Sequence, residues 1–186
     1  MKYVLSFFLT ISFFISFGQN DISSFVPIDY EVLDEVIGDL NNDGIEDKIF
    51  VLNQIDEEVK YQKYGKKTNR ILQILIGSSN EKYKLAFQSS NLIYPFGSEA
   101  NFKDCFTQVV IKKGFFSLEH YGGTITRWKR ITTFKYSSSK ENWLLFKDGY
   151  LTFSFDRPNK IVSERIKTQK DFGVVNINDF NITNKF

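Results

Sequence analysis

The sequence predicts a mainly β protein with little helix, in which two antiparallel meanders pack together. Short runs rich in β-branched and aromatic residues recur along the chain and are separated by polar or glycine-containing turns. Few stretches show the apolar period of an amphipathic helix. The 186 residues include 20 Phe, 9 Tyr and 2 Trp. Side chains for a hydrophobic core are therefore plentiful.

Residues 1–18 have the organisation of a cleaved secretory signal. Lys2 gives a positive start, Val4–Phe17 is almost purely apolar, and Ser16 and Gly18 supply small residues before the cleavage point. The alternative is a membrane anchor, but the run is shorter than the roughly 20 residues that a spanning helix needs. We therefore expect an exported protein, periplasmic or extracellular, with no membrane span in the mature chain.

The mature chain, residues 19–186, is long enough for a single β-rich domain with halves at about 26–90 and 106–157. Removing the signal takes away one lysine, so 24 basic residues become 23 against 22 acidic ones. This balance gives no reason to expect a nucleic-acid partner. Cys105 is the only cysteine, which excludes an internal disulfide, and we expect it to be buried as a small apolar side chain.

Each half contains a series of predicted strands. Those of the first half are Val32–Ile37, Lys48–Leu52, Ile71–Ile76 and Tyr83–Phe87. Those of the second half are Phe106–Ile111, Phe115–Tyr121, Thr126–Tyr136, Trp143–Phe146 and Tyr150–Phe155. Residues 89–104, with Pro95 and Gly97, form the predicted linker.

Two stretches do not fit a strand pattern. The first is the lysine-rich segment Glu57–Arg70, in which Lys66, Lys67 and Arg70 are expected in an exposed loop. The second is the tail after Pro158, which allows a short helix around Ser163–Lys170.

The stretch "GDLNNDGIED" at residues 38–47 is a candidate calcium loop. Calcium takes roughly 6–8 oxygen ligands, which a loop supplies when oxygen-bearing side chains alternate and a glycine permits a sharp bend. Gly44 provides the bend, and the candidate ligands are the side chains of Asp39, Asn41, Asp43 and Asp47 with the carbonyl of Ile45. A polar turn is the alternative interpretation, because Asn, Asp and Gly dominate turns. Without a cation, however, the three carboxylates would repel one another.

The loop is not an EF-hand, because Phe50 occupies the twelfth position, where that motif has glutamate. The stretch "GDLNNDGIEDKIFVL" resembles the calcium loop of FG-GAP and VCBS-type repeats, in which an apolar strand follows the aspartates. Together with "GFFSLEHYGGTITRWKRITTFKY" it is similar to a group of exported bacterial proteins. The resemblance implies the five metal ligands named above, and it implies no catalytic activity.

The FG-GAP repeat family forms propellers, but this chain carries the aspartate loop once and has room for about three blades. A closed propeller needs at least about four. A partial propeller-like array is therefore the alternative to two packed meanders.

The second block contains His120, the only histidine of the chain. Strand alternation places Glu119 on the opposite face from His120, so this carboxylate is badly placed to orient the imidazole ring. A core or edge histidine is the simpler interpretation. On the next strand Trp128 and Arg130 share one face, a platform that could stack on a sugar ring or bind an anionic glycan. The alternative is that Trp128 fills the core.

Two functions follow from these features. The first is a non-enzymatic exported module with a structural calcium loop that binds a protein or glycan partner through a surface including His120, Trp128 and Arg130. The second is a small exported enzyme, or an enzyme inhibitor, that uses a cleft around His120.

Overall fold

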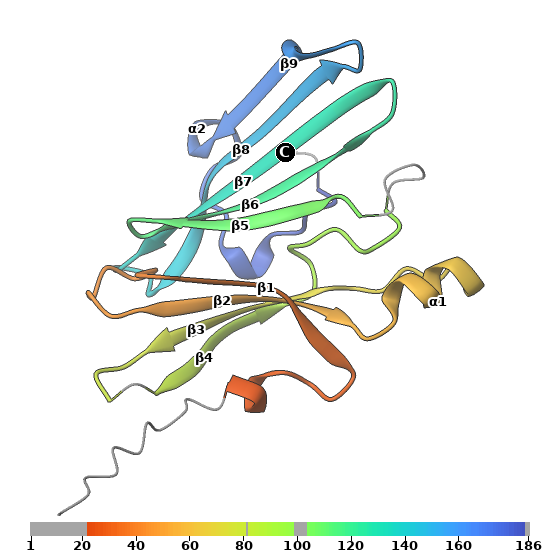
Figure 1. The fold of residues 1–186 in the computed structure, drawn as a ribbon. Coiled ribbons are helices and arrows are strands. Elements are labelled where there is room, and N and C mark those ends of the chain that lie inside the picture. The colour runs from red at the N-terminus through yellow and green to blue at the C-terminus, as the bar shows by residue number, and fades with distance from the viewer. Residues whose placement is uncertain (1–21, 81, 99–103, 185–186) are drawn as a thin grey trace, which may run out of the picture.

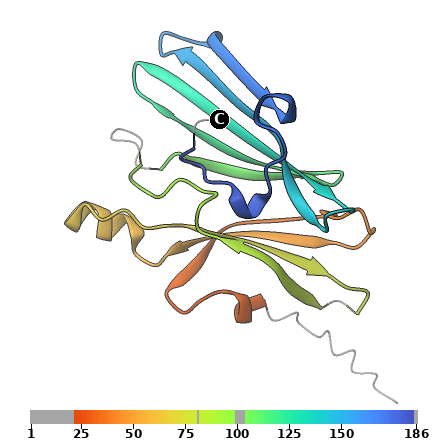
Figure 2. The same cartoon turned by 180° about the vertical axis from the view of Figure 1, so that it is seen from behind.

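The computed structural model describes residues 22–80, 82–98 and 104–184, which form two antiparallel sheets (Figures 1 and 2). The first sheet has the order β1-β2-β3-β4, with bounds Tyr30–Gly38, Asp47–Gln54, Ile71–Gly77 and Tyr83–Ser89. The second has the order β5-β6-β7-β8-β9, with bounds Phe106–Lys112, Phe115–Gly123, Thr126–Ser137, Asn142–Ser154 and Arg157–Thr168. The prediction of a mainly β fold with two packed antiparallel meanders is confirmed.

The helical segments are short. They are η1 (Ile22–Phe25), α1 (Glu57–Tyr64), α2 (Gln169–Phe172) and η2 (Ile177–Asp179). Helix α1 lies in the lysine-rich segment and ends at Gly65, whose φ of 63° favours glycine. Within the described ranges, no helix has the length and apolar character that crossing a membrane requires. The predicted signal, residues 1–18, lies outside the described residues.

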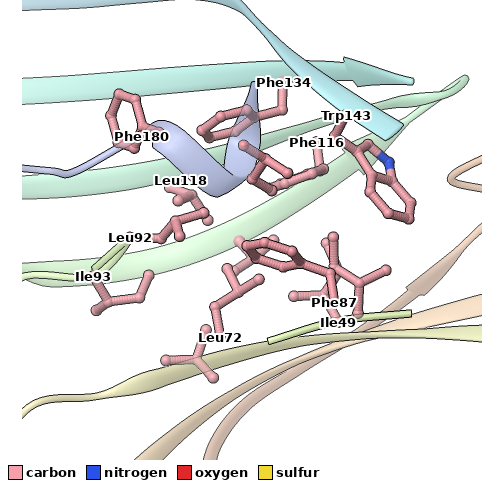
Figure 3. Packing of buried hydrophobic residues seen from close by; sticks show 14 of the residues in the cluster. Ile49, Leu72, Phe87, Leu92, Ile93, Phe116, Leu118, Phe134, Trp143 and Phe180 are labelled. Atoms are coloured by element: carbon pink, nitrogen blue, oxygen red, sulfur yellow. The ribbon is translucent and has the colours of Figure 1, made fainter. Parts of the chain in front are cut away.

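The hydrophobic core lies between the two sheets (Figure 3). Because each sheet turns alternate side chains to this space, both contribute fully buried residues. Ile49 and Leu72 come from the first sheet, and Leu118 comes from the second. Phe116 and Phe134 stack on neighbouring strands of the second sheet with ring centroids 5.1 Å apart. The halves therefore share one core.

Two irregular segments add to this core. The predicted linker does connect the sheets, but its residues Leu92 and Ile93 are buried between them (Figure 3). Near the C-terminus, Ile177, Phe180 and Ile182 enter the same space. The sheets are thus held together partly by residues that belong to neither.

A second cluster covers the outer face of the first sheet. Phe50, Leu52 and Leu75 point away from the main core and pack against Ile22 and Phe25 of the N-terminal segment. Strand β2 is therefore buried on both faces, which explains why its sequence is a continuous apolar run rather than an alternating one.

Two predictions for the second half are wrong. The predicted strands Trp143–Phe146 and Tyr150–Phe155 are parts of one strand, β8, whose pairing with β7 contains an irregularity between Thr133 and Phe134. The predicted helix around Ser163–Lys170 is mostly strand β9, which pairs with β8, and only α2 is helical. Pairing satisfies the backbone groups of the β8 edge, which a separate helix would leave open.

Candidate metal loop and ligand cavity

The candidate calcium loop connects β1 to β2 and lies against the second sheet. The amide of Gly114, in the β5–β6 turn, donates a hydrogen bond to the carbonyl of Asp39 at 3.3 Å. Leu40 is fully buried in the core. Gly44 has a φ of 82°, the conformation for which the sequence requires glycine. The loop is thus anchored to both sheets.

The polar side chains of the loop accept hydrogen bonds from the loop's own backbone amides. The Asp39 carboxylate accepts hydrogen bonds from the amides of Asn42 at 2.6 Å and Gly44 at 3.0 Å. Asn41 Oδ1 accepts from the amide of Asp43 at 2.9 Å, and Asp43 Oδ1 accepts from the amide of Ile45 at 2.8 Å. These hydrogen bonds hold the loop in a series of local turns.

Asp47 is fully buried at the start of β2. Its carboxylate accepts hydrogen bonds from the amides of Leu40 at 2.8 Å and Gly77 at 3.0 Å. Burial raises the pKa of Asp47 and the like charges of Asp43 and Asp39 raise it further, while the two backbone hydrogen bonds oppose the shift. Within the described ranges no basic side chain forms a salt bridge with Asp47. The Asp47 carboxylate is therefore buried near the carboxylates of Asp43 and Asp39.

The loop offers oxygen atoms but not a finished cage. No group of three or more His, Cys, Asp or Glu residues in the described part of the chain is arranged to hold a metal ion. The Asn41 amide nitrogen donates to Asp43 Oδ2 at 2.8 Å, so these two predicted ligands contact each other. The donor set fits a hard cation, and some ligands would have to turn toward it.

A cavity of about 470 Å³ opens on the inner face of the second sheet. Its walls include three aromatic residues, Tyr94, Trp128 and Tyr150, and two cations, Arg130 and Arg165. Hydroxyl groups of Thr152 and Ser163 lie in the same wall, 2.7 Å apart. This volume lies within the range of small-molecule binding sites.

Two aromatic rings of the cavity stack on each other, and this stacked pair, called the platform below, has a third ring edge-on beside it. The rings of Trp128 and Tyr150 are nearly parallel, at 15°, with centroids 5.7 Å apart. Tyr94 meets Trp128 edge-on at 6.0 Å. A Cβ atom added to Gly122 would lie 2.7 Å from the Trp128 indole, so the indole lies against a backbone position that has no side chain. Because Gly122 has no side chain, the Trp128 indole can pack against the backbone of β6.

Arg130 forms the base of the cavity and is only 5% exposed. It binds both carboxylate oxygens of Asp148, at 2.9 and 3.0 Å. It also donates to the Tyr94 hydroxyl at 2.9 Å, to the carbonyl of Ile182, and to the carbonyl of Asn184 at 3.1 Å. Burial alone would lower the pKa of Arg130, but Asp148 and Tyr94 raise it.

These contacts occupy all five guanidinium donors. Arg130 therefore organises the cavity and has no donor left for a ligand.

His120 lies behind this cavity rather than in its wall. It is fully buried, and its ring contacts Tyr94 edge-on at 5.0 Å and Phe106 at 5.8 Å. Neither ring nitrogen has a hydrogen-bond partner among the described residues. Burial, reinforced by the charges of Arg130 and Arg70, lowers the pKa of His120 to about 3, so the ring is neutral.

The acid–base arrangement that the enzyme hypothesis requires is therefore not formed around His120. No carboxylate or hydroxyl of the described residues hydrogen-bonds to the ring. Of the predicted ligand surface, the structure places Trp128 in the cavity wall, Arg130 at its base and His120 behind it.

The sequence interpretation misses most of the cavity residues, among them Tyr94, Tyr150 and Arg165. Tyr94 belongs to the segment predicted as a linker, and Arg165 to the segment predicted as a helix. Tyr150 lies in a predicted strand, whose alternation places Tyr150 and Thr152 on one face. This alternation is the sequence signal from which Tyr150 and Thr152 could have been identified.

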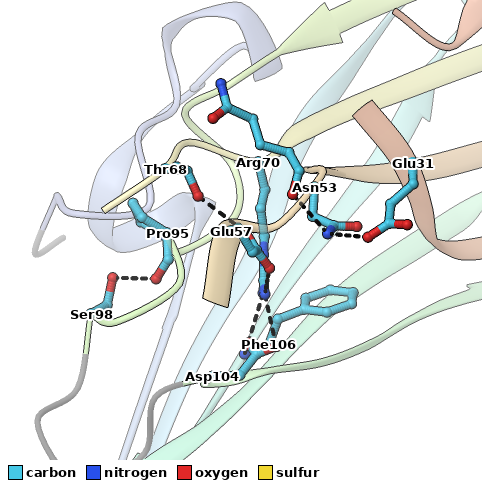
Figure 4. A network of polar contacts seen from close by, with 10 residues as sticks. Glu31, Asn53, Glu57, Thr68, Arg70, Pro95, Ser98, Asp104 and Phe106 are labelled. Carbon is cyan, nitrogen blue, oxygen red and sulfur yellow. Dashed lines mark hydrogen bonds and ion pairs between the residues drawn. The ribbon is translucent and has the colours of Figure 1, made fainter. Parts of the chain in front are cut away.

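Arg70 is the centre of a buried polar network that joins the two sheets (Figure 4). It lies in the turn before β3 and is 1% exposed. It binds Asp104, just before β5, at 2.7 and 2.8 Å, and it also binds Glu57 of α1. The prediction that Arg70 belongs to an exposed loop is wrong, whereas Lys66 and Lys67 are exposed.

Cys105 is buried, as expected, and adjoins the cavity. Comparison with protein-family models, curated proteins and solved structures finds no match to this chain. The function proposed below therefore rests on the contacts within the chain.

Proposed function

We propose that the protein is an exported, non-enzymatic module that binds a glycan partner in the cavity of the second sheet. The observation that supports this is the platform of Trp128 and Tyr150 with the upright ring of Tyr94 beside it. The apolar faces of sugar rings stack on such aromatic surfaces, and sugar hydroxyls pair with polar groups at the rim.

A glycan suits this site better than a protein surface does. The cavity is concave and small, and it combines aromatic rings with the hydroxyls of Thr152, Ser163 and Thr183. Protein partners generally need about 800 Å² of matched surface on each side. A single saccharide can use the platform and the hydroxyls together.

We also propose that loop 39–47 binds a structural calcium ion through Asp39, Asn41, Asp43, Asp47 and the carbonyl of Ile45. The buried carboxylate of Asp47, near those of Asp43 and Asp39, supports this because a divalent cation would favour its charged form. The resemblance to FG-GAP and VCBS-type loops points the same way. At a Kd of about 10⁻⁴ M and millimolar calcium, mass action stabilises the fold by about 1.4 kcal/mol.

The glycan proposal is tested by binding of the purified mature protein to a microarray of saccharides, followed by titration calorimetry. The Trp128→Ala variant removes the larger ring of the platform, so we expect it to lose binding at least tenfold, about 1.4 kcal/mol. Tyr64→Ala removes a ring that is 68% exposed and lies outside the cavity, and it serves as the control. Equal binding by Trp128→Ala and the unmodified protein would contradict the proposal.

The calcium proposal is tested by thermal melting with calcium and with a chelator. We expect calcium to raise the Tm by about 3–6 °C. The Asp43→Ala variant should show no rise, and Asp29→Ala, an exposed aspartate outside the loop, should show the full rise. A full rise in Asp43→Ala would show that the ion binds elsewhere.

A further inference from the structure

We infer that the saccharide is anionic and that its carboxylate or sulfate group binds Arg165. This inference rests on the proposed glycan function and specifies the ligand of the same cavity. Three features support it: the charges of the cavity wall, the position of Arg165, and the hydroxyl groups beside it.

The described residues of the cavity wall carry positive charge. Among them are Arg130 and Arg165 but no aspartate or glutamate. The charge of Arg130 is neutralised by Asp148, which lies beneath the wall and is itself 5% exposed. Among the described residues of the wall, Arg165 is therefore the cation that no carboxylate pairs with.

Arg165 is also positioned to bind an anion. It lies on β9 directly opposite Tyr150, and its guanidinium is 5.8 Å from the centre of that ring. Within the described ranges it forms no ion pair and no side-chain hydrogen bond. The ring supports the guanidinium plane by a cation–π contact while its donors stay available. A guanidinium presents paired donors that match a carboxylate or a sulfate.

The hydroxyl groups extend the same site. Thr152 pairs with Ser163 on the same two strands, two residues along from the pair of Tyr150 and Arg165. That step places the hydroxyls about 7 Å from the Tyr150–Arg165 pair. A sugar ring that packs against the Trp128–Tyr150 pair could therefore place its anionic group at Arg165 and its hydroxyls at Thr152 and Ser163.

The test compares saccharides that differ only in charge. The microarray carries neutral, uronate and sulfated oligosaccharides, and calorimetry then compares an oligogalacturonate with its uncharged methyl ester, and each bound sulfated sugar with its unsulfated form. We expect the anionic form to bind about tenfold more tightly than its neutral match. If the preference for the anionic form appears with uronates, Arg165 binds a carboxylate. If it appears with sulfated sugars, Arg165 binds a sulfate.

Three variants assign the charge preference to Arg165. Arg165→Gln should reduce binding of the anionic sugar about tenfold and leave the neutral match unchanged. Arg165→Lys should retain part of the preference, because lysine keeps the charge but loses the planar fork. Arg157→Gln removes the same charge from the same strand, at a residue outside the cavity wall, and should bind like the unmodified protein.

The outcomes separate this inference from the function on which it rests. If neutral and anionic sugars bind equally, or if Arg165→Gln keeps the preference, the inference is wrong and the glycan function stands. If no saccharide of any class binds, or if Trp128→Ala binds unchanged, the glycan function is wrong and the inference falls with it.

Discussion

Acidification should destabilise this protein through His120. The buried ring has a pKa of about 3 in the folded chain, against about 6.5 in the unfolded chain. Below about pH 6.5 the unfolded chain therefore binds a proton that the folded chain excludes, so stability falls as the pH drops toward 3. Arg130 and Arg70 reinforce this shift, and Asp104 opposes it.

The size of the effect at pH 5 follows from the unfolded pKa alone. One group that titrates only in the unfolded state changes the free energy of unfolding by about 1.36 kcal/mol per pH unit. Between pH 8 and pH 5, only the range of about 1.5 pH units below the unfolded pKa counts. His120 therefore lowers the free energy of unfolding by about 2 kcal/mol over this range. The exact folded pKa does not alter this value while it stays below about 4.

Urea unfolding at pH 8 and pH 5, for the unmodified protein and for His120→Phe, isolates this contribution. Phenylalanine keeps an aromatic ring between Tyr94 and Phe106 but cannot titrate, and carboxylate effects cancel in the difference between the two proteins. We expect the unmodified protein to lose about 2 kcal/mol more than the variant between the two pH values. An equal loss in both proteins would refute the reasoning, as would titration of the His120 proton resonance near pH 6.5 in the folded state.

Further predictions concern the buried network, a turn and the core. Arg70→Ala leaves the buried carboxylate of Glu57 unpaired and should cost about 3–5 kcal/mol in denaturant unfolding, whereas a cost below about 1 kcal/mol would mean that water replaces the guanidinium. Gly123→Ala should cost more than about 1 kcal/mol in the same assay, because φ is 91° and the new Cβ would lie 2.1 Å from the Thr126 carbonyl oxygen, and an unchanged midpoint would contradict that geometry. Leu40→Ala removes a fully buried side chain and should cost about 2–5 kcal/mol, and a smaller loss would place the loop outside the core.

Local patterns predicted most of the sheet structure. Strands such as β2 and β6 carry their signal in the alternation or continuity of apolar residues, which needs no distant partner. Strand β9 could not be recognised in this way. Its state depends on the open edge of β8, and the segment around Arg165 has no apolar period strong enough to indicate that pairing.

The candidate sites also differ in how far local sequence predicts them. The aspartate loop is contiguous, so its donors and its glycine can be read from spacing, although whether Asp47 is buried cannot. The cavity combines Tyr94, Trp128, Tyr150 and Arg165 from four separate segments. Of these four, only Trp128 could be predicted, because it shares a strand face with Arg130. His120 can be singled out in the sequence as the sole histidine. Its burial depends on packing against Tyr94 and Phe106, which come from other segments.

The contacts of Arg130 tie residues 182–184 to the second sheet. Two of its acceptors are carbonyls that lie 52 and 54 residues further along the chain. A chain truncated before Ile182 would have all the strands but would lose two of the hydrogen-bond acceptors of this buried arginine. We expect such a chain to be more readily cleaved by proteases than the unmodified protein.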